Sequence, residues 1–356
     1  MAKKNNRGKR VIIRTILLIL IGLVVLTGLG GWFAYKYVVK SSNLNLGGRS
    51  TAYFYIYTGS TYNQVIDSLY DKGYIINKNT FEWMLEQKNY KNHVHPGRYL
   101  LKANMNNDEL IDLLRSGEQQ PVKVTFNTVR TKDQLAKKVA EYIEATEDEL
   151  YEMLDSRDLA NEYGFSREKF ITMFLPNTYE FYWNTSAEQF VERMAKEYKT
   201  FWNEKRVAKA EKLGLSQSDV TILASIVQSE QSRRREEWPT IAGLYINRLK
   251  KGMPLQSDPT LIFALGNFSI RRVLNSHKEI DSPYNTYKNT GLPPGPILLP
   301  SIHCIDAVLN YERNNYLFMC AKADLSGYHH FAATYDEHLV YARQYRDSLN
   351  QKGIYK

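Results

Sequence analysis

The feature that most constrains this chain is an uncharged apolar run near the N-terminus, TILLILIGLVVLTGLGGWFAY, residues 15–35. At a rise of 1.5 Å per residue, a helix over this run is roughly 31 Å long, about the thickness of a bilayer's hydrocarbon core. Six basic residues precede the run and two follow it. The positive-inside rule therefore predicts a cytoplasmic tail over residues 1–14, a single transmembrane helix over 15–38 and an exported remainder, anchored in the cell (inner) membrane. The aromatic residues suited to the outer membrane interface are Trp32, Tyr35 and Tyr37.

A cleaved signal peptide is the alternative for this run. Against it, the run is longer than the 7–15 residues usual for the apolar core of a signal peptide. No clear A-x-A cleavage site follows it. We therefore favour the uncleaved anchor.

The positive charge of the chain is concentrated in the same segment. The formal net charge is +9, and residues 1–40 contain eight Lys or Arg and no acid. The other 316 residues therefore carry only about +1, which is not the charge of a nucleic-acid-binding surface. We expect no nucleic-acid partner.

The cysteine and glycine patterns give no sign of a cofactor. Cys304 and Cys320 could pair in an exported protein, although two buried free thiols are the expectation we favour. No Cys/His cluster has the spacing of zinc ligands, and no Gly-rich phosphate loop is present. We expect neither a metal nor another cofactor.

Outside the membrane, hydrophobic periodicity divides the chain into two parts. Residues 39–50 are largely polar with Gly and Ser, which favours a short linker. Residues 51–120 contain two strand-turn-helix patterns and form a small α+β module. Residues 121–356 are mainly helical by pattern, with mixed strands, and one helix begins at Ser216 with a capping box. The fold class is therefore α+β.

The helix in ILASIVQSEQS carries an acid, Glu230, on its apolar stripe. At 100° per residue, Leu223 lies about 20° from Glu230 around the helix and Ile226 about 40°, whereas Gln228 lies about 160° away. A carboxyl held against apolar groups has a raised pKa and can act as a general acid. The alternative is a partly buried salt bridge with one of Arg233–Arg235.

Three blocks in this region together form a distinctive sequence. They are LASIVQSEQ, IAGLYINRLKKGMPLQSDPTLIFALG and SPYNTYKNTGLPPGPI, within residues 215–300. In order and spacing they resemble the endolytic murein transglycosylase (YceG-like) family, as does a single anchor followed by a small module. The resemblance implies a LysM-like module over 51–120 and a lysozyme-like or YceG-like catalytic domain over 121–356.

The resemblance implies that Glu230 cuts glycan strands of peptidoglycan without water. Glu230 would protonate the oxygen between N-acetylmuramic acid and N-acetylglucosamine, and then take the proton of the muramoyl C6 hydroxyl as it closes on C1. The product is a 1,6-anhydromuramoyl end, formed in nascent strands beside penicillin-binding synthases, which are the expected partners. Termination of glycan elongation is the expected role.

Two other functions stay open at this stage. The family usually has V-E-x-E where this chain has Val227-Gln228-Ser229-Glu230, so a catalytically inactive peptidoglycan-binding scaffold is the first. The second is a muramidase that uses water and leaves a reducing end. The stretch FITMFLPNTY also lacks an acid and a glycine that family members often have.

The neighbouring motifs supply candidates for substrate binding. These are Gln256, Ser257, Asp258, Tyr284, Asn285, Tyr287, Asn247 and His330. Gln256, Ser257 and Asp258 could instead form a turn, with Asp258 capping a helix at Pro259. Asn247 could orient Glu230, and His330 could have only a packing role.

Overall fold

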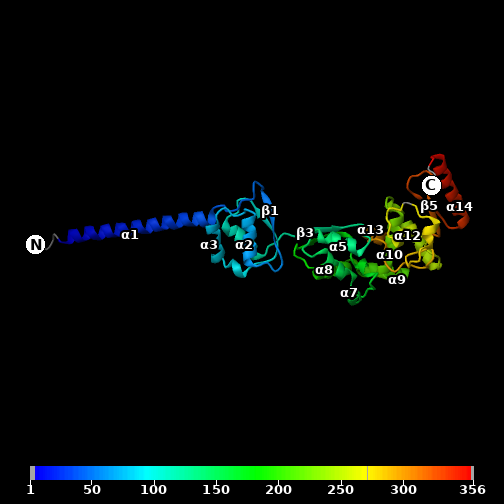
Figure 1. The fold of residues 1–356 in the computed structure, drawn as a ribbon, viewed down its shortest axis with the longest axis horizontal. Helices are drawn as coiled ribbons and strands as arrows, with labels where there is room; N and C mark the ends of the chain where they lie inside the picture. Colours follow the sequence, from blue (N-terminus) through cyan, green and yellow to red (C-terminus); the bar gives the residue numbers. More distant parts are fainter. Residues whose placement is uncertain (1–4, 271, 354–356) are drawn as a thin grey trace. The chain divides into compact units, whose positions relative to one another are not determined.

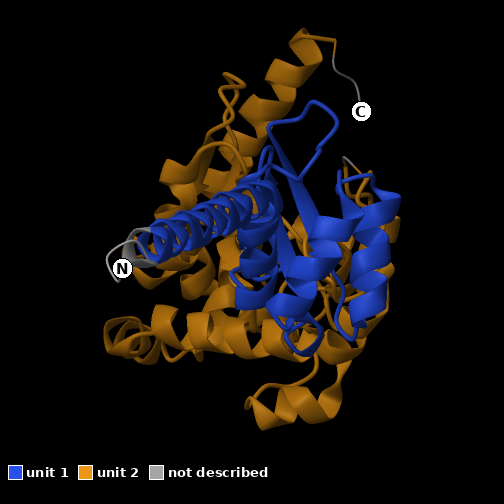
Figure 2. Cartoon of the chain, turned by 90° about the vertical axis from the view of Figure 1, so that its left-hand side faces the viewer, with its two compact units in different colours: residues 1–122, 182–184 blue, residues 123–181, 185–356 orange. Residues whose placement is uncertain are grey.

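The computed structural model describes residues 5–270 and 272–353, which form two compact units. The first contains the residues up to 122 together with 182–184, and the second contains 123–181 and 185–356 (Figure 2). Figure 1 gives the order of the helices and strands along the chain.

The first unit begins with one long helix, α1 (Asn5–Tyr35), which continues as a π-helical turn, η1 (Lys36–Lys40). The stretch Gly8–Lys40 is long enough to cross a membrane and contains an 18-residue window with a mean hydropathy of 2.6. None of that window is buried against the rest of the chain, and its apolar side chains are exposed, such as Leu18 and Val24. The helix includes the predicted span and begins well before residue 15.

The rest of the first unit is a two-stranded antiparallel sheet with helices around it. Strand β1 (Thr51–Ile56) pairs with β2 (Gly97–Lys102), and its side chains alternate between exposed and buried. Phe54 lies opposite Tyr99 in this pair, and both are fully buried. The helices of the unit are α2 (Tyr62–Asp71), α3 (Lys78–Gln87), η2 (Tyr90–Asn92) and α4 (Asn107–Ser116).

The segment expected to be a flexible linker, 39–50, is partly packed into this unit. Leu44 and Leu46 belong to its hydrophobic core. Asn43 is buried, and its amide donates hydrogen bonds to Asn107 Oδ1 and to a backbone carbonyl. The composition of this segment is polar and rich in Gly and Ser, but two leucines at alternate positions pack into the core. Residues 39–50 are therefore not a free linker.

The second unit is mainly helical, and its described residues contain two short two-stranded sheets. Strand β3 (Val122–Phe126) pairs with β4 (Asn177–Phe181), and β5 (Phe318–Ala321) pairs antiparallel with β6 (His329–Ala332). Its helices are α5 (Lys132–Ala140), α6 (Glu147–Asp155), α7 (Arg157–Glu162), η3 (Phe170–Met173), α8 (Ala187–Phe201), α9 (Glu204–Leu213), α10 (Gln217–Glu230), η4 (Arg235–Glu237), α11 (Trp238–Lys250), α12 (Asp258–Leu265), η5 (Asn275–Glu279), α13 (Ile302–Leu309) and α14 (Tyr335–Gln351).

Helix α10 is the central element of this unit. The predicted capping box forms at its start, where Ser216 Oγ accepts from the backbone N–H of Asp219 and the Asp219 carboxylate accepts from the N–H of Ser216. Every side chain from Val220 to Val227 is buried, because α10 packs against α11, α12 and α13. The burial is therefore not confined to a stripe, and the chain leaves the core only at the last turn, which carries Glu230.

Helix α11 approaches the segment after α13 closely. A Cβ atom added to Gly243 would lie 2.3 Å from the carbonyl oxygen of Glu312, so only glycine allows this contact. This close approach lies two residues before Tyr245 on the same helix. Both cysteines of the unit are free thiols, Cys304 buried and Cys320 half-buried.

Candidate active site

Glu230 is the last residue of α10 and accepts two hydrogen bonds from side chains of other elements. Tyr245 Oη on α11 donates to Glu230 Oε1 over 2.8 Å, and Ser257 Oγ donates to the same oxygen over 2.5 Å. Burial is the largest influence on this carboxyl and raises its pKa above the usual value, and the negative charge of Asp258 acts in the same direction. The two hydrogen bonds favour the carboxylate and partly offset this rise. The result is a carboxyl that is held in place and has a raised pKa, which suits a general acid.

Glu230 opens onto a cavity of about 310 Å³. Its polar lining includes Arg248, Gln256, Asp258 and Tyr287. Apolar side chains also line it, among them Leu317 and the first two residues of β5, together with Tyr335 and His338 of α14. Such a mixture of apolar surface and a few polar groups is typical of sites that bind a small ligand, and it suits a sugar ring, whose edge carries hydroxyls and whose face is apolar.

Three of the predicted binding residues follow one another beside Glu230. Ser257 is fully buried, so its hydroxyl serves the carboxyl of Glu230 and cannot bind a sugar directly. Gln256 has a positive φ of 55°, and its side-chain oxygen accepts from Arg248. Asp258 begins α12 and accepts a hydrogen bond of 2.6 Å from the hydroxyl of Tyr287. The left-handed residue Gln256 turns the chain so that Ser257 and Asp258 both reach this site.

The other predicted binding residues have different surroundings. Asn247 donates to the backbone carbonyls of Asn314 and Tyr316 and does not contact Glu230. Asn285 is fully buried and donates to two carbonyls of the η5 region. Tyr284 packs its ring 4.8 Å from that of Phe263, and burial raises its pKa to about 12. These three residues shape loops around the site, and none of them lines the cavity of Glu230.

The histidine beside the acid is His329, whereas the sequence favoured His330. The ring of His330 stacks on Tyr341 at 4.4 Å between centroids. His329 lies on the other face of β6, and its Nδ1 is 3.4 Å from the amide nitrogen of Gln231, the residue after Glu230. Alternation along a strand separates the two rings, and the sequence alone did not say which face lies towards α10.

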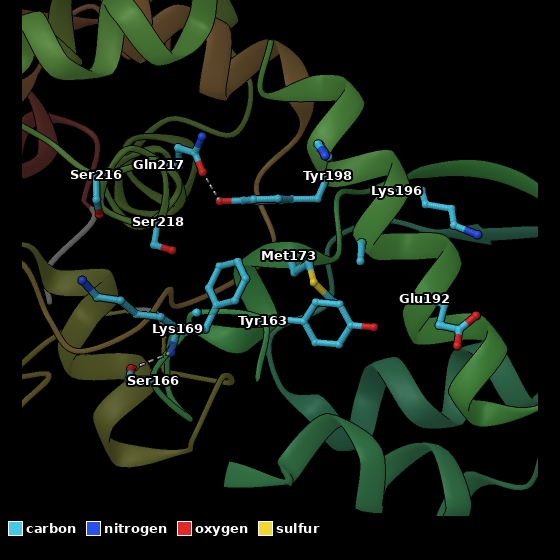
Figure 3. Close-up of a pocket in the computed structure, with 14 residues that line it drawn as sticks. Tyr163, Ser166, Lys169, Met173, Glu192, Lys196, Tyr198, Ser216, Gln217 and Ser218 are labelled. Atoms are coloured by element: carbon cyan, nitrogen blue, oxygen red, sulfur yellow. Dashed lines mark hydrogen bonds between the residues drawn. The ribbon is translucent and has the colours of Figure 1, made fainter. Parts of the chain in front are cut away.

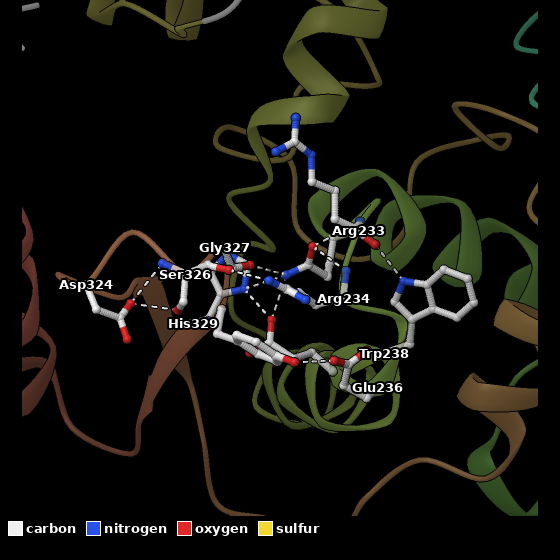
Figure 4. Close-up of polar contacts among 11 residues, drawn as sticks. Arg233, Arg234, Glu236, Trp238, Asp324, Ser326, Gly327 and His329 are labelled. Carbon is white, nitrogen blue, oxygen red and sulfur yellow. Dashed lines mark hydrogen bonds and ion pairs between the residues drawn. The ribbon is translucent and has the colours of Figure 1, made fainter.

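A buried acid, Glu237, holds the ring of His329, which is labelled in Figure 4. Its two oxygens accept from the backbone N–H of His329 and face His329 Nδ1, each over 2.8 Å. The amide of Gln231, the residue after Glu230, donates to Glu237 Oε2 over 2.7 Å. Glu237 belongs to the charged run RRREE, residues 233–237, and its side chain turns inward from η4 and is buried.

Another cavity, of about 650 Å³, lies at the opposite end of α10 (Figure 3). It is lined by Tyr163, Tyr198 and the first residues of α10. Its lysine nearest to α10, Lys169, already forms an ion pair of 2.8 Å with Asp219. Helix α10 is 14 residues long, so this cavity is about 20 Å from Glu230 and is not part of the candidate active site.

Known proteins with similar sequences and structures agree on one family. The chain is 29% identical over 320 residues to the endolytic murein transglycosylase of Bacillus subtilis (strain 168), which covers 85% of this chain and 87% of that protein. It is 27% identical over 356 residues to the endolytic murein transglycosylase of Streptococcus pneumoniae, of whose length it spans 62%. Its structure is similar to the 2.6 Å crystal structure of a putative yceG-like protein from Listeria monocytogenes, with a TM-score of 0.55 and 27% identity over 82% of this chain and 98% of that one. The model of the YceG-like family matches residues 54–344, and the chain therefore belongs to the YceG-like family.

Proposed function

We propose that the protein is a membrane-anchored lytic transglycosylase that cuts within the glycan strands of peptidoglycan. The observation that carries the proposal is the single carboxyl of Glu230, which has a raised pKa and is held by two hydroxyls at the edge of a cavity. The names of the relatives in Bacillus subtilis and Streptococcus pneumoniae support the substrate and the reaction class.

In the proposed reaction Glu230 acts first as an acid and then as a base. Its proton goes to the bridging oxygen between N-acetylmuramic acid and N-acetylglucosamine, and the bond from that oxygen to C1 breaks. The resulting carboxylate takes the proton of the muramoyl C6 hydroxyl, whose oxygen forms the new bond to C1. The hydroxyls of Tyr245 and Ser257 stabilise the carboxylate between the two steps. No water is consumed, and a 1,6-anhydromuramoyl end remains.

A muramidase is the second candidate, because another acid lines the same cavity. Asp258 could activate a water molecule, as the base of an inverting glycosidase does. Its carboxylate already accepts a short hydrogen bond from Tyr287, which supports a role in holding the substrate-binding wall instead. The product distinguishes the two reactions.

The inactive scaffold has less support than the sequence alone suggested. Gln228 stands where the family usually has its first acid, and its side-chain oxygen accepts from the N–H and hydroxyl of Ser301, at the start of α13. This contact is on the side of α10 away from the cavity of Glu230. A glutamine there can keep a structural contact and leave the proposed acid unaffected.

Membrane anchoring by α1, an N-terminus in the cytoplasm and an extracytoplasmic catalytic unit are parts of the same proposal. Such an anchor would confine cutting to nascent strands near the membrane, where penicillin-binding synthases are the expected partners. A LysM-like role for the first unit in binding glycan stays a prediction.

The test is a mass spectrum of the products from uncrosslinked nascent glycan and the detergent-solubilised full chain. We expect muropeptides lighter by one water at the muramoyl end. Hydrated reducing ends would identify a muramidase. Absence of cleavage by a folded protein, with a substrate that a known transglycosylase digests, would favour the scaffold.

A change at Tyr245 should move the pH dependence of the reaction. In Tyr245→Phe the carboxylate of Glu230 loses a hydrogen-bond donor, so its pKa rises further. Because the acid must be protonated, the limb of the kcat/KM profile that falls with increasing pH should shift to higher pH. The maximal rate should also fall, by about tenfold or less, since a charged hydrogen bond is lost. An unshifted limb, measured on purified strands between pH 5 and 9, would show that Glu230 is not the group that titrates.

A further inference from the structure

A cavity of about 640 Å³ lies on the other side of the end of α10 from Glu230. Its lining includes Gln228, Ser229 and Ser232, whereas Glu230 lines the smaller cavity described above. The start of α12 separates the two spaces in the same way, with Asp258 in the smaller and Pro259 in the larger. The two cavities therefore flank one ridge, and a branched ligand bound at Glu230 could reach both.

Two arginines give the larger cavity its electrostatic character. The guanidinium of Arg130 lies 4.4 Å from the ring centre of Phe268, and that of Arg235 lies 5.6 Å from the ring centre of Trp238. Within residues 5–270 and 272–353, neither forms an ion pair with an acid, and no acidic side chain lines the cavity. A guanidinium stacked on a ring keeps its N–H edge free for a carboxylate.

The rest of the lining suits a peptide better than a bare sugar. Apolar side chains from 259–270 and 297–299 form much of the wall. Amide and hydroxyl groups of Asn127, Thr128 and Gln228 complete it. The cavity volume lies in the range of sites that hold a small ligand almost completely.

We infer that this cavity binds the stem peptide of the muramoyl residue being cut, with Arg130 and Arg235 pairing with its carboxylates. The inference rests on the proposed function. A stem of about five residues reaches at most roughly 17 Å when extended, and a helix with its side chains is about 10 Å across. A stem attached to the sugar beside Glu230 can therefore pass the end of α10 and enter the cavity. The lactyl group by itself is too short to do so.

The function that follows is a preference for strands that still carry their peptides. Nascent strands have intact stems, and strands that amidases have stripped do not. By binding the stem peptide, the two arginines would direct cutting to nascent strands, while Glu230 performs the chemistry.

The test compares three substrates made from one batch of strands: with intact stems, after removal of the stems by an amidase, and with the stem carboxylates converted to methylamides. The full chain should cut the intact strands at least about tenfold faster than either of the others. Arg130→Gln with Arg235→Gln should lower kcat/KM on intact strands to the value for stripped strands, mainly through KM. The rate of cutting of stripped strands should stay unchanged in this double variant. Changing Arg235 to Lys instead of Gln should keep part of the preference for intact strands, because lysine keeps the positive charge.

The matched control is Arg157→Gln, which removes one positive charge from an exposed position at the start of α7. It should keep the full preference. Equal rates of the wild-type chain on intact and stripped strands would overturn the inference, as would parallel losses on both substrates in the arginine variants. The wild-type chain could also cut stripped strands more slowly than intact strands but methylamidated strands as fast as intact ones. That result would show that the peptide is recognised without its charge, and it would overturn the role of the arginines. A phosphate at the end of a strand is the same in all three substrates. If the arginines bound that phosphate and not the stem, the three substrates would be cut at equal rates. Cutting of none of the substrates would count against the proposed function itself.

Discussion

Replacing Glu230 with glutamine should lower the rate of glycan cleavage by at least about 10³-fold, because one side chain supplies both the acid and the base. The amide keeps the size of the carboxyl and can still accept from Tyr245 and Ser257. Binding of strands should therefore persist while the chemistry is lost, and the effect should appear in kcat and not in KM. The measurement is single-turnover cleavage of labelled strands by the full chain.

The control for this variant is Glu204→Gln, the same chemical change at an exposed position on α9. Its rate should equal that of the unchanged chain. Asp258→Asn adds a second comparison: a product and rate close to the wild type would exclude Asp258 as a base. A Glu230→Gln protein that cuts strands at the wild-type rate would remove Glu230 from the mechanism altogether.

The stability of the Glu230 variant also has an expected sign. The pKa of Glu230 is raised in the folded chain, so the folded state binds a proton more tightly than the unfolded state. Its stability therefore falls as the pH rises from the unfolded pKa of about 4.3 through the folded pKa. Glutamine does not ionise, so Glu230→Gln should melt at the same or a higher temperature than the wild type at pH 7, and the difference should vanish near pH 4. A lower melting temperature at pH 7 would show that the carboxylate stabilises the fold.

Replacing Glu237 with alanine should cause the largest loss of stability near the site, about 3–5 kcal/mol, the usual effect of removing one member of a buried charged group. Three contacts to the carboxyl are lost together, those of His329 Nδ1, the N–H of His329 and the amide of Gln231, and the Gln231 amide keeps only the carbonyl of Gly327 as a strong acceptor. In a unit of this size such a loss lowers the melting temperature by roughly 10 °C. Thermal unfolding of the full chain measures it. Cleavage should also slow at temperatures where the variant is folded, because β6 and the end of α10 are no longer tied together.

The neighbouring glutamate gives the control for this change. Glu236, which is labelled in Figure 4, is exposed and accepts a hydrogen bond from the hydroxyl of Tyr328. Glu236→Ala removes the same atoms from the same turn and should leave the melting temperature nearly unchanged. Equal melting temperatures for the two variants would show that the Glu237 network does not stabilise the fold.

The sequence by itself determined the features that depend on near neighbours in the chain. The apolar run predicted α1, and the capping box at Ser216 predicted the start of α10. The position of Glu230 among apolar residues predicted a carboxyl with a raised pKa, which the burial at the end of α10 produces. These patterns repeat with the period of one helix or one strand, so they can be recognised without knowing the rest of the fold.

Tertiary structure alone decided which side chains surround that carboxyl. Ser257 lies 27 residues after Glu230, and His329 lies 92 residues after its partner Glu237. In the same way, the amide of Asn247 and the buried Asn285 hold loops, although their composition suited sugar binding. A polar residue type shows that a hydrogen bond is needed, and only the folded chain determines whether the partner is a catalytic acid, a backbone carbonyl or a substrate.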